Sequence, residues 1–309
     1  MKIAITGGTG LIGSALGRLL ISEGHTVVSI ARGSDGRQRN VAGFVQAEIT
    51  DEQALAAAFA GCDAVAHCAG VNRERPGGTY MDVHVRGTEA MVRAARAARV
   101  GRVVLVSFLR ARPNCGSPYH ESKWEAEEIV RRSGLPYVIL KCGIVYGRGD
   151  HLLDHLSHML HTLPLFAPVG FRGNPVAPAA VEEVARILAA ASIEGRLDGQ
   201  TFAVAGPERL DLSEVVRRVG RAVHRRVLIV PMPVWFHRAL ASVLERCMKV
   251  PLISKAQVRI LAEGAADPLP ADSKLPPDLR PVRSFTEIQI RGGLPQPGPF
   301  HRSDLGCCR

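Results

Sequence analysis

Two side chains that could move a proton lie four residues apart, Tyr119 and Lys123. The segment 119–133 has the pattern of a helix, and positions four apart project from the same face of a helix. An ammonium group favours a neighbouring phenolate, so the spacing predicts a lowered pKa for the Tyr119 hydroxyl and a role in proton transfer. Ser107 ends the predicted strand before this helix, where its hydroxyl could hydrogen-bond a substrate oxygen.

A glycine-rich turn near the start of the chain is the second feature with chemical meaning. It follows the apolar run Ile3–Ile5, precedes the amphipathic stretch Ser14–Ser22, and has three glycines spaced three apart. Glycine lets a backbone turn tightly and a pyrophosphate approach, while the next helix offers N–H groups and a positive dipole end. In this context the turn predicts a dinucleotide site rather than an ordinary αβ connection. The residues expected to line the site are Gly7, Thr9, Gly10, Leu11, Ile12 and Gly13.

Apolar runs alternate with amphipathic stretches through the first half, which is typical of buried parallel strands joined by helical crossovers. The predicted strands are Lys2–Thr6, Thr26–Ala31, Phe44–Gln46, Ala64–His67, Arg102–Ser107 and Tyr137–Leu140. The predicted helices are Ser14–Ser22, Glu52–Ala60, Met81–Ala98 and Tyr119–Ser133. We therefore expect an α/β protein, a doubly wound parallel-sheet Rossmann fold with a smaller C-terminal substrate-side lobe.

The regular alternation weakens after Gly147. The elements expected there are helices His151–Thr162, Val181–Ala191, Leu212–Val223, Val234–Val250 and Ser254–Glu263, and strands Thr201–Val204 and Val227–Val230. Prolines then break up the chain. We expect a dinucleotide-binding Rossmann core over 1–147, a mixed lobe over 148–264 with segments that return to the core, and a proline-rich loop and extended tail over 265–309.

The spacing Thr-Gly-x-x-Gly-x-x-Gly, followed by a serine and then Tyr-x-x-x-Lys, resembles the short-chain dehydrogenase/reductase superfamily. The likeness is to its extended and atypical branch, the NAD-dependent epimerase/dehydratase-like proteins. The resemblance implies that Tyr119 gives or takes the proton. It also implies that Lys123 holds the cofactor ribose and that Ser107 orients a carbonyl or alcohol.

Other segments are similar to the same superfamily, in the right order along the chain. Cys68, Ala69 and Gly70 resemble the end of its fourth strand, which contacts the adenosine and ribose side of the cofactor. Gly143 and Ile144 lie in a segment that resembles the one beside the nicotinamide.

The chain also departs from the superfamily's pattern at two places. Lys141 and Cys142 stand where the superfamily has Arg-Pro. His84 replaces the asparagine of the helix motif Asn-x-x-Gly-Thr, a residue that helps to arrange water and the active-site backbone. The second departure puts the proton relay of the superfamily in question for this chain.

Within that superfamily the chain looks most like the complex I 39-kDa accessory subunit-like group. The short loop Phe108–Pro118, the segment Tyr119–Glu127 and the segment Gly292–Pro295 carry this likeness. Members of that group can keep the tyrosine and lysine and serve as nucleotide-binding structural subunits. Two hypotheses follow: an oxidoreductase or epimerase-type enzyme acting on an unknown alcohol or ketone, or a non-catalytic nucleotide-binding protein linked to a respiratory complex or quinone metabolism.

The end of the second predicted strand bears on the choice of cofactor. NAD enzymes usually place an acid there for the ribose 2′-hydroxyl, but this chain has Arg32, and its first acid is Asp35. A guanidinium could pair with a 2′-phosphate, with Arg37 and Arg39 as further candidates. We therefore expect NADP(H) in preference to NAD(H). An exposed loop arginine without a ligand is the alternative interpretation.

The composition limits the partners and the compartment. The net charge is +10, but the arginines are spread over helices without a dense block, so we expect solvated helix faces and no nucleic acid. Attraction to an acidic substrate or an anionic membrane is the alternative. Seven cysteines without a C-x-x-C pair are typical of reduced thiols in a cytoplasmic protein. No apolar run reaches the roughly 18 residues of a spanning helix, and no signal peptide is visible.

Three further features have more than one interpretation. We expect a half-exposed polar stripe where histidines recur on one helix face, with a substrate contact as the alternative and no metal site. These are His151, His155, His158 and His161. The helix that begins near Trp235 and Phe236 is expected to cover a core, with peripheral membrane contact less favoured. Cys307 and Cys308 are expected in an inert tail, with lipidation or redox chemistry as the alternative.

Overall fold

The computed structural model describes residues 1–33, 43–74, 78–163, 165–171, 173, 175–247, 258–259, 262 and 274–294. The chain divides into two compact units. The first comprises Met1–Cys142, Val181–Val204 and Pro268–Pro281, and the second comprises Gly143–Ala180, Ala205–Asp267 and Val282–Arg309. Asp35, Arg37, Arg39, Cys307 and Cys308 lie outside the described residues, as does nearly all of the predicted helix 254–263.

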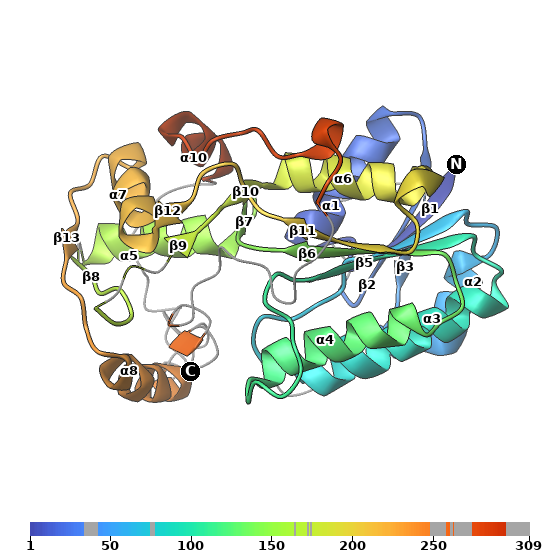
Figure 1. Ribbon diagram of the computed structural model, residues 1–309, viewed down its shortest axis with the longest axis horizontal. Coiled ribbons are helices and arrows are strands. Elements are labelled where there is room, and N and C mark those ends of the chain that lie inside the picture. The colour runs from blue at the N-terminus through green and yellow to red at the C-terminus, as the bar shows by residue number, and fades with distance from the viewer. Residues whose placement is uncertain are drawn as a thin grey trace. The chain divides into compact units, whose positions relative to one another are not determined.

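The first unit is built on a seven-stranded sheet in which all neighbouring strands are parallel. Its strands are β1 (Lys2–Thr6), β2 (Thr26–Ala31), β3 (Gly43–Gln46), β4 (Ala64–His67), β5 (Arg102–Phe108), β6 (Tyr137–Cys142) and β11 (Gln200–Val204). Their order is β11-β6-β5-β4-β1-β2-β3 (Figure 1). The order reverses direction between β1 and β4, so the ligand crevice of a doubly wound sheet is expected at the carboxyl ends of these two strands.

Helices cover both faces of this sheet, and the core lies between the layers. α1 (Leu11–Ser22) packs with α6 (Val181–Ile193) on one face. α2 (Glu52–Phe59), α3 (Gly87–Ala97) and α4 (Pro118–Arg131) lie on the other (Figure 1). The strands are apolar almost throughout because both of their faces are buried. The predicted Rossmann architecture is therefore confirmed, and β11 joins it from late in the chain.

The predicted helix 81–98 is not regular. It begins as a π-helix, η1 (Met81–Arg86), and continues as α3. Within this π turn the side chains of Val83, His84 and Val85 are all buried. Hydrophobic periodicity alone does not separate the two kinds of helix, so the sequence could not predict this change of winding.

The second unit combines helices with short strand pairs. Its helices are α5 (His151–Thr162), α7 (Leu212–Ala222), α8 (Val234–Cys247) and α10 (Glu287–Gly293). β7 (Val145–Tyr146) pairs with β10 (Ala179–Ala180), β9 (Pro175–Val176) with β12 (Leu210–Asp211), and β8 (Leu165–Phe166) with β13 (Leu228–Ile229). Most of these two-residue strands are too short to produce a periodic sequence signal. Among the described residues, no helix has the length and apolarity needed to cross a bilayer.

Two short 3₁₀ helices complete the described elements, η2 (Gly195–Leu197) and η3 (Pro277–Leu279). The expectation of loop and extended chain over 265–309 is wrong at η3 and at α10. The Thr286 hydroxyl oxygen accepts a hydrogen bond from the Gln289 N–H and so caps α10, while Ile290 is fully buried in the core of the second unit. A cap and one buried anchor stabilise a helix too short to show a clear period.

Candidate functional site

In the glycine turn, backbone atoms pack directly against other backbone atoms, with no side chain between them. Gly7 has a φ of +68°, and a Cβ added to it would lie 2.7 Å from the Ala69 nitrogen. A Cβ on Gly13 would lie 2.4 Å from the Gly7 carbonyl oxygen. Neither contact can be relieved by moving a flexible side chain, so glycine is required at both positions. The turn therefore lies directly against the segment that follows β4.

The N-terminus of α1 is suited to an anion. Its N-cap is Gly10, which makes no side-chain cap, and its first turn contains no acidic residue. The first N–H groups of a helix have no partner within the helix, and they carry the positive end of its dipole. Thr9, Leu11 and Ile12 are partly exposed at this end. This cradle fits a dinucleotide pyrophosphate, and Cys68, Ala69 and Gly70 border it.

Substitution of Gly13 tests this cradle. We expect Gly13→Ala to lower dinucleotide affinity about 5- to 150-fold, because relieving a backbone clash of this kind costs about 1–3 kcal/mol and moves the turn. The matched control is Gly17→Ala on the same helix, where the added Cβ makes only ordinary contacts with side chains, to Ile5 at 3.7 Å and to Val27 at 3.9 Å. Calorimetric titration of both variants measures the difference. Equal affinities in the two variants would contradict the assignment of the turn.

Lys123 lies on the buried face of α4 beside Gly70. Its Nζ donates to the Val106 carbonyl at 3.2 Å, and a Cβ on Gly70 would lie 3.1 Å from the same Nζ. Burial, partly offset by Cys142 and Glu127, lowers the pKa of Lys123 to about 8. The ammonium group therefore stands at the carboxyl end of β4, next to the residues that border the glycine turn.

Tyr119 lies one turn earlier on the same helix face and is 6% exposed. Its ring makes edge contacts with those of Tyr80, His84 and Phe108, at centroid distances of 5.2–5.7 Å. Its hydroxyl donates to the Asn72 Oδ1 at 3.3 Å. Burial raises the pKa of Tyr119, and Tyr80 raises it further. The lowered pKa that the sequence predicts for Tyr119 is therefore wrong for this structure, because burial disfavours the charged phenolate.

Ser107 forms a separate buried contact. Its hydroxyl donates to the Glu127 Oε1 at 2.5 Å, and both residues lie in the core. Lys141, which is paired with Ser107 across β5 and β6, places its Nζ 3.8 Å from the Glu127 Oε2. Arg131 donates to the same carboxylate oxygen at 2.9 Å. The structure thus brings Tyr119 and Lys123 to one face, and it joins Ser107 to a buried carboxylate.

Lys141 and Glu127 are both 0% exposed. The Lys141 Nζ also donates to the Ala111 carbonyl at 3.0 Å. Burial raises the pKa of Glu127, while Lys141 and then Ser107 lower it. Lys141, Arg131 and Ser107 therefore surround the Glu127 carboxylate. In a low-dielectric core, these polar contacts take the place of water around the buried charges. Lys141 thus acts as a structural cation in this network.

Arg32 is exposed at the end of β2. The Gln46 Nε2 donates to its carbonyl at 2.9 Å, and its Nη1 lies 3.5 Å from where a Cβ on Gly78 would stand. Gly143 and Ile144 belong to the second unit, and their place beside a nicotinamide stays a prediction.

Sequence reasoning missed three residues of this region. Asn72 accepts from the Tyr119 hydroxyl through its side chain and from the Tyr80 hydroxyl, at 3.1 Å, through its carbonyl. Glu127 holds Ser107. Neither the asparagine nor Tyr80 stands in a recognisable motif, so only their position in space reveals them. Glu127 lies four residues after Lys123, and that spacing was the available signal.

Helix α5 carries the predicted histidine stripe, of which the side chains of His158 and His161 are described and those of His151 and His155 are not. The His158 Nε2 lies 3.3 Å from the Asp154 carboxylate, and the His161 Nδ1 donates to the Ser157 carbonyl at 2.8 Å. Among the described residues, no group of three His, Cys, Asp or Glu side chains is placed to hold a metal. Trp235 is 70% exposed and Phe236 is half-buried, so the membrane contact stays a prediction.

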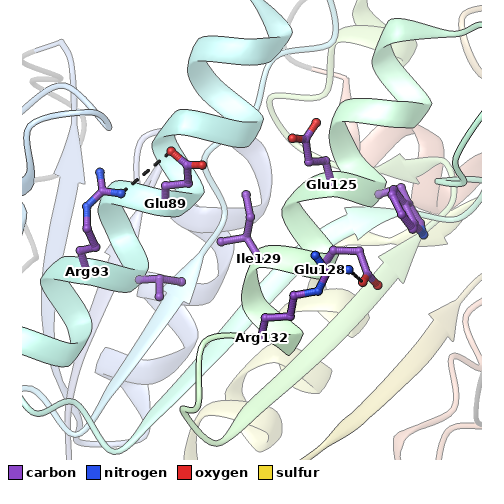
Figure 2. Close-up of a pocket in the computed structure, with 8 residues that line it drawn as sticks. Glu89, Arg93, Glu125, Glu128, Ile129 and Arg132 are labelled. Carbon is purple, nitrogen blue, oxygen red and sulfur yellow. Dashed lines mark hydrogen bonds and ion pairs between the residues drawn. The ribbon is translucent and has the colours of Figure 1, made fainter.

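A groove lies between α3 and α4 (Figure 2). Its lining residues are Glu89, Val92, Arg93, Trp124, Glu125, Glu128, Ile129 and Arg132. Those on α4 occupy the side of that helix away from Tyr119 and Lys123. Ion pairs within α3 and within α4 line the rim. The groove contains none of the predicted site residues.

The sheet order, the glycine turn against β4 and the Tyr119–Lys123 face define a dinucleotide-binding Rossmann protein. The chain belongs to the NAD dependent epimerase/dehydratase family, whose model matches residues 3–167.

Curated relatives match most of this chain, and solved structures share its fold. An uncharacterized protein of Mycobacterium tuberculosis is 28% identical over 84% of this chain and 27% of its own length, so the chain spans about a quarter of that relative. The NADH-ubiquinone oxidoreductase 40 kDa subunit of Neurospora crassa is 24% identical over 82% of this chain and 68% of that protein. The structure of MoeE5 in complex with UDP-glucose and NAD shares the fold, with a TM-score of 0.67 and 18% identity over 95% of this chain and 97% of that one.

Proposed function

We propose that this protein binds a nicotinamide dinucleotide, NADP(H) in preference to NAD(H), and uses it to interconvert an alcohol and a ketone. The observation that carries the proposal is the buried face of α4. It places the Tyr119 hydroxyl and the Lys123 ammonium at the carboxyl edge of the sheet, beside Gly70 and the glycine turn. Doubly wound sheets bind their ligands at this edge.

The residues have distinct roles in this reaction. The turn Gly7–Gly13 and the N-terminus of α1 would hold the pyrophosphate, and Lys123 would hold the ribose. The bound nicotinamide supplies or accepts the hydride. In the reducing direction Tyr119 would give its proton to the carbonyl oxygen of the substrate, and the Lys123 ammonium would stabilise the resulting phenolate. The Tyr119 hydroxyl must first leave Asn72 for the substrate.

Ser107 takes part only if its hydrogen bond is redirected. Its proton is committed to Glu127 in this structure, and a substrate carbonyl would have to replace that acceptor. Tyr119 is therefore the proton-transfer group, and Ser107 would orient the substrate once its hydroxyl has left Glu127.

Arg32 tests the cofactor preference. We expect Arg32→Ala to lower NADPH affinity about 10- to 100-fold, because hydrogen bonds to a charged group contribute about 1.5–3 kcal/mol. NADH affinity should change little, since that cofactor has no 2′-phosphate. Calorimetric titration with both nucleotides measures the effect, and Arg93→Ala, an exposed arginine on α3, is the control. Tighter binding of NADH by the wild type, or unchanged NADPH affinity in the variant, contradicts the preference.

A second candidate function is non-catalytic dinucleotide binding. It is supported by the packing of Tyr119 among aromatic rings, by the committed Ser107 hydroxyl and by the likeness to the Neurospora subunit. A turnover screen of the pure protein with NADPH and NADP⁺ against pooled sugars, steroids, quinones and aldehydes separates the two. Nucleotide consumption that Tyr119→Phe abolishes supports the enzyme. Tight nucleotide binding without consumption in any pool supports the binding protein.

A further inference from the structure

A buried chain of hydrogen bonds leads from β1 to α4 through two histidines. The Thr6 hydroxyl lies 2.7 Å from the His67 Nδ1, because the two residues are direct neighbours across β1 and β4. The His67 Nε2 lies 3.3 Å from the Thr88 hydroxyl, which donates to the His84 carbonyl at 2.5 Å. This series of hydrogen bonds therefore begins at Thr6, one residue before the glycine turn, and ends at the π-helix η1.

The side chain of His84 continues this chain to the helix that carries Tyr119 and Lys123. The Val71 N–H donates to the His84 Nε2 at 3.1 Å. On the other side, the His84 Nδ1 lies 2.9 Å from the Ser122 hydroxyl, which donates to the Tyr119 carbonyl at 3.0 Å. His84 is 2% exposed, so water cannot replace either partner.

The donors and acceptors fix the protonation of both rings. A backbone N–H can only donate, so the His84 Nε2 carries no proton, and its Nδ1–H must donate to Ser122. The Thr88 hydroxyl uses its proton on the His84 carbonyl, so it accepts from the His67 Nε2–H, and the His67 Nδ1 accepts from Thr6. Burial, followed by the charge of Lys123, lowers the pKa of both histidines, to about 3 for His67, which agrees with neutral rings.

We infer that His84, held as the Nδ1–H tautomer, is a positioning residue that fixes the segment after β4 to helix α4. The fixed segment includes Asn72, the acceptor for the Tyr119 hydroxyl, and it follows Gly70, where an added Cβ would lie 3.1 Å from the Lys123 Nζ. His84 thereby sets the distance between the proton-transfer group and the cofactor edge of the sheet. This inference rests on the proposed function for its effect on turnover, but its structural part does not.

Two substitutions test separately the two hydrogen bonds of the His84 imidazole. The amide nitrogen of an asparagine superposes on the Nδ1 of histidine, so His84→Asn keeps the donor to Ser122 and loses the acceptor for Val71. The amide of a glutamine reaches the place of Nε2, so His84→Gln keeps the acceptor for Val71. The exposed His224 provides the control His224→Asn.

The first measurement is the imidazole ¹⁵N spectrum of the whole protein, with His84 assigned by its substitution. We expect a neutral Nδ1–H tautomer that does not titrate between pH 5 and 8. The second is amide hydrogen exchange at Val71, which should be about fivefold faster in His84→Asn and near wild type in His84→Gln, since one lost hydrogen bond is worth about 1 kcal/mol. An Nε2–H tautomer, a charged ring at neutral pH, or equal exchange in both variants overturns the inference.

The third measurement uses dinucleotide turnover. His84→Asn should lower kcat about tenfold with a nearly unchanged KM for the nucleotide, and His84→Gln should restore most of it. If the spectrum and the exchange rates are as expected but no substrate pool consumes nucleotide, the proposed enzyme fails and the positioning contact stands. If turnover is present and His84→Asn leaves kcat unchanged, the positioning role fails and the enzyme stands.

Discussion

Replacing Tyr119 with phenylalanine is expected to reduce dinucleotide turnover about 10²- to 10⁴-fold, the range for loss of a positioned proton-transfer group. Nucleotide affinity should stay close to that of the wild type, because the ring and its aromatic contacts remain. The control is Tyr80→Phe, which removes a neighbouring hydroxyl that donates to the Asn72 carbonyl. Equal turnover in the two variants would show that the Tyr119 hydroxyl does not carry the proton.

The pH profile gives a second check of the same site. Burial lowers the pKa of Lys123 to about 8, so its ammonium group loses its proton as the pH rises through that value. Stabilisation of the Tyr119 phenolate is lost with it, and kcat/KM should fall above about pH 8. The stability of the fold should change with pH in the opposite direction and rise above about pH 8. A lysine whose folded pKa lies below its unfolded value destabilises the fold most at low pH, and this penalty disappears between pH 8 and the usual lysine range.

Removal of the Glu127 carboxylate should have the largest effect on stability. Glu127→Ala removes the carboxylate that lies 3.8 Å from the buried Lys141 ammonium, and it also removes the acceptor of the Ser107 hydroxyl. Breaking a buried pair in this way costs about 3–5 kcal/mol. Urea denaturation followed by circular dichroism should show the lower midpoint.

The neighbouring carboxylate provides a matched control for this measurement. Glu128 also pairs with Arg131, at 2.8 Å, but its side chain reaches solvent. Glu128→Ala should therefore cost less than about 1 kcal/mol. The double variant Glu127→Met with Lys141→Met should regain part of the lost stability, because no buried charge is then left unpaired. Equal losses for Glu127→Ala and Glu128→Ala would contradict the role of the buried network.

The sequence predicts those parts of the site whose chemistry depends on local spacing. The glycine turn is visible because Gly7, Gly10 and Gly13 stand between an apolar run and an amphipathic one, and the fold follows from the same alternation. Tyr119 and Lys123 are visible because a spacing of four gives one helix face. Each of these signals is contained within a few consecutive residues.

The remaining features depend on contacts between distant segments. Asn72 becomes a partner of Tyr119 only when the segment after β4 meets α4. The pKa of Tyr119 depends on its burial, and the residues next to it in the sequence do not show how far it is buried. The π-winding of η1, which contains His84, has the same hydrophobic pattern as an α-helix.

The late arrival of β11 has a consequence for synthesis on the ribosome. β6 is complete at Cys142, but its outer neighbour begins at Gln200, so at about 5–20 residues per second the sheet stays unfinished for several seconds. During this interval β6 is an edge strand whose apolar side chains and unpaired backbone groups can join another nascent chain. Aggregation during expression should therefore depend on chaperone supply, and a version shortened after β6 should accumulate in inclusion bodies even though its glycine turn is intact.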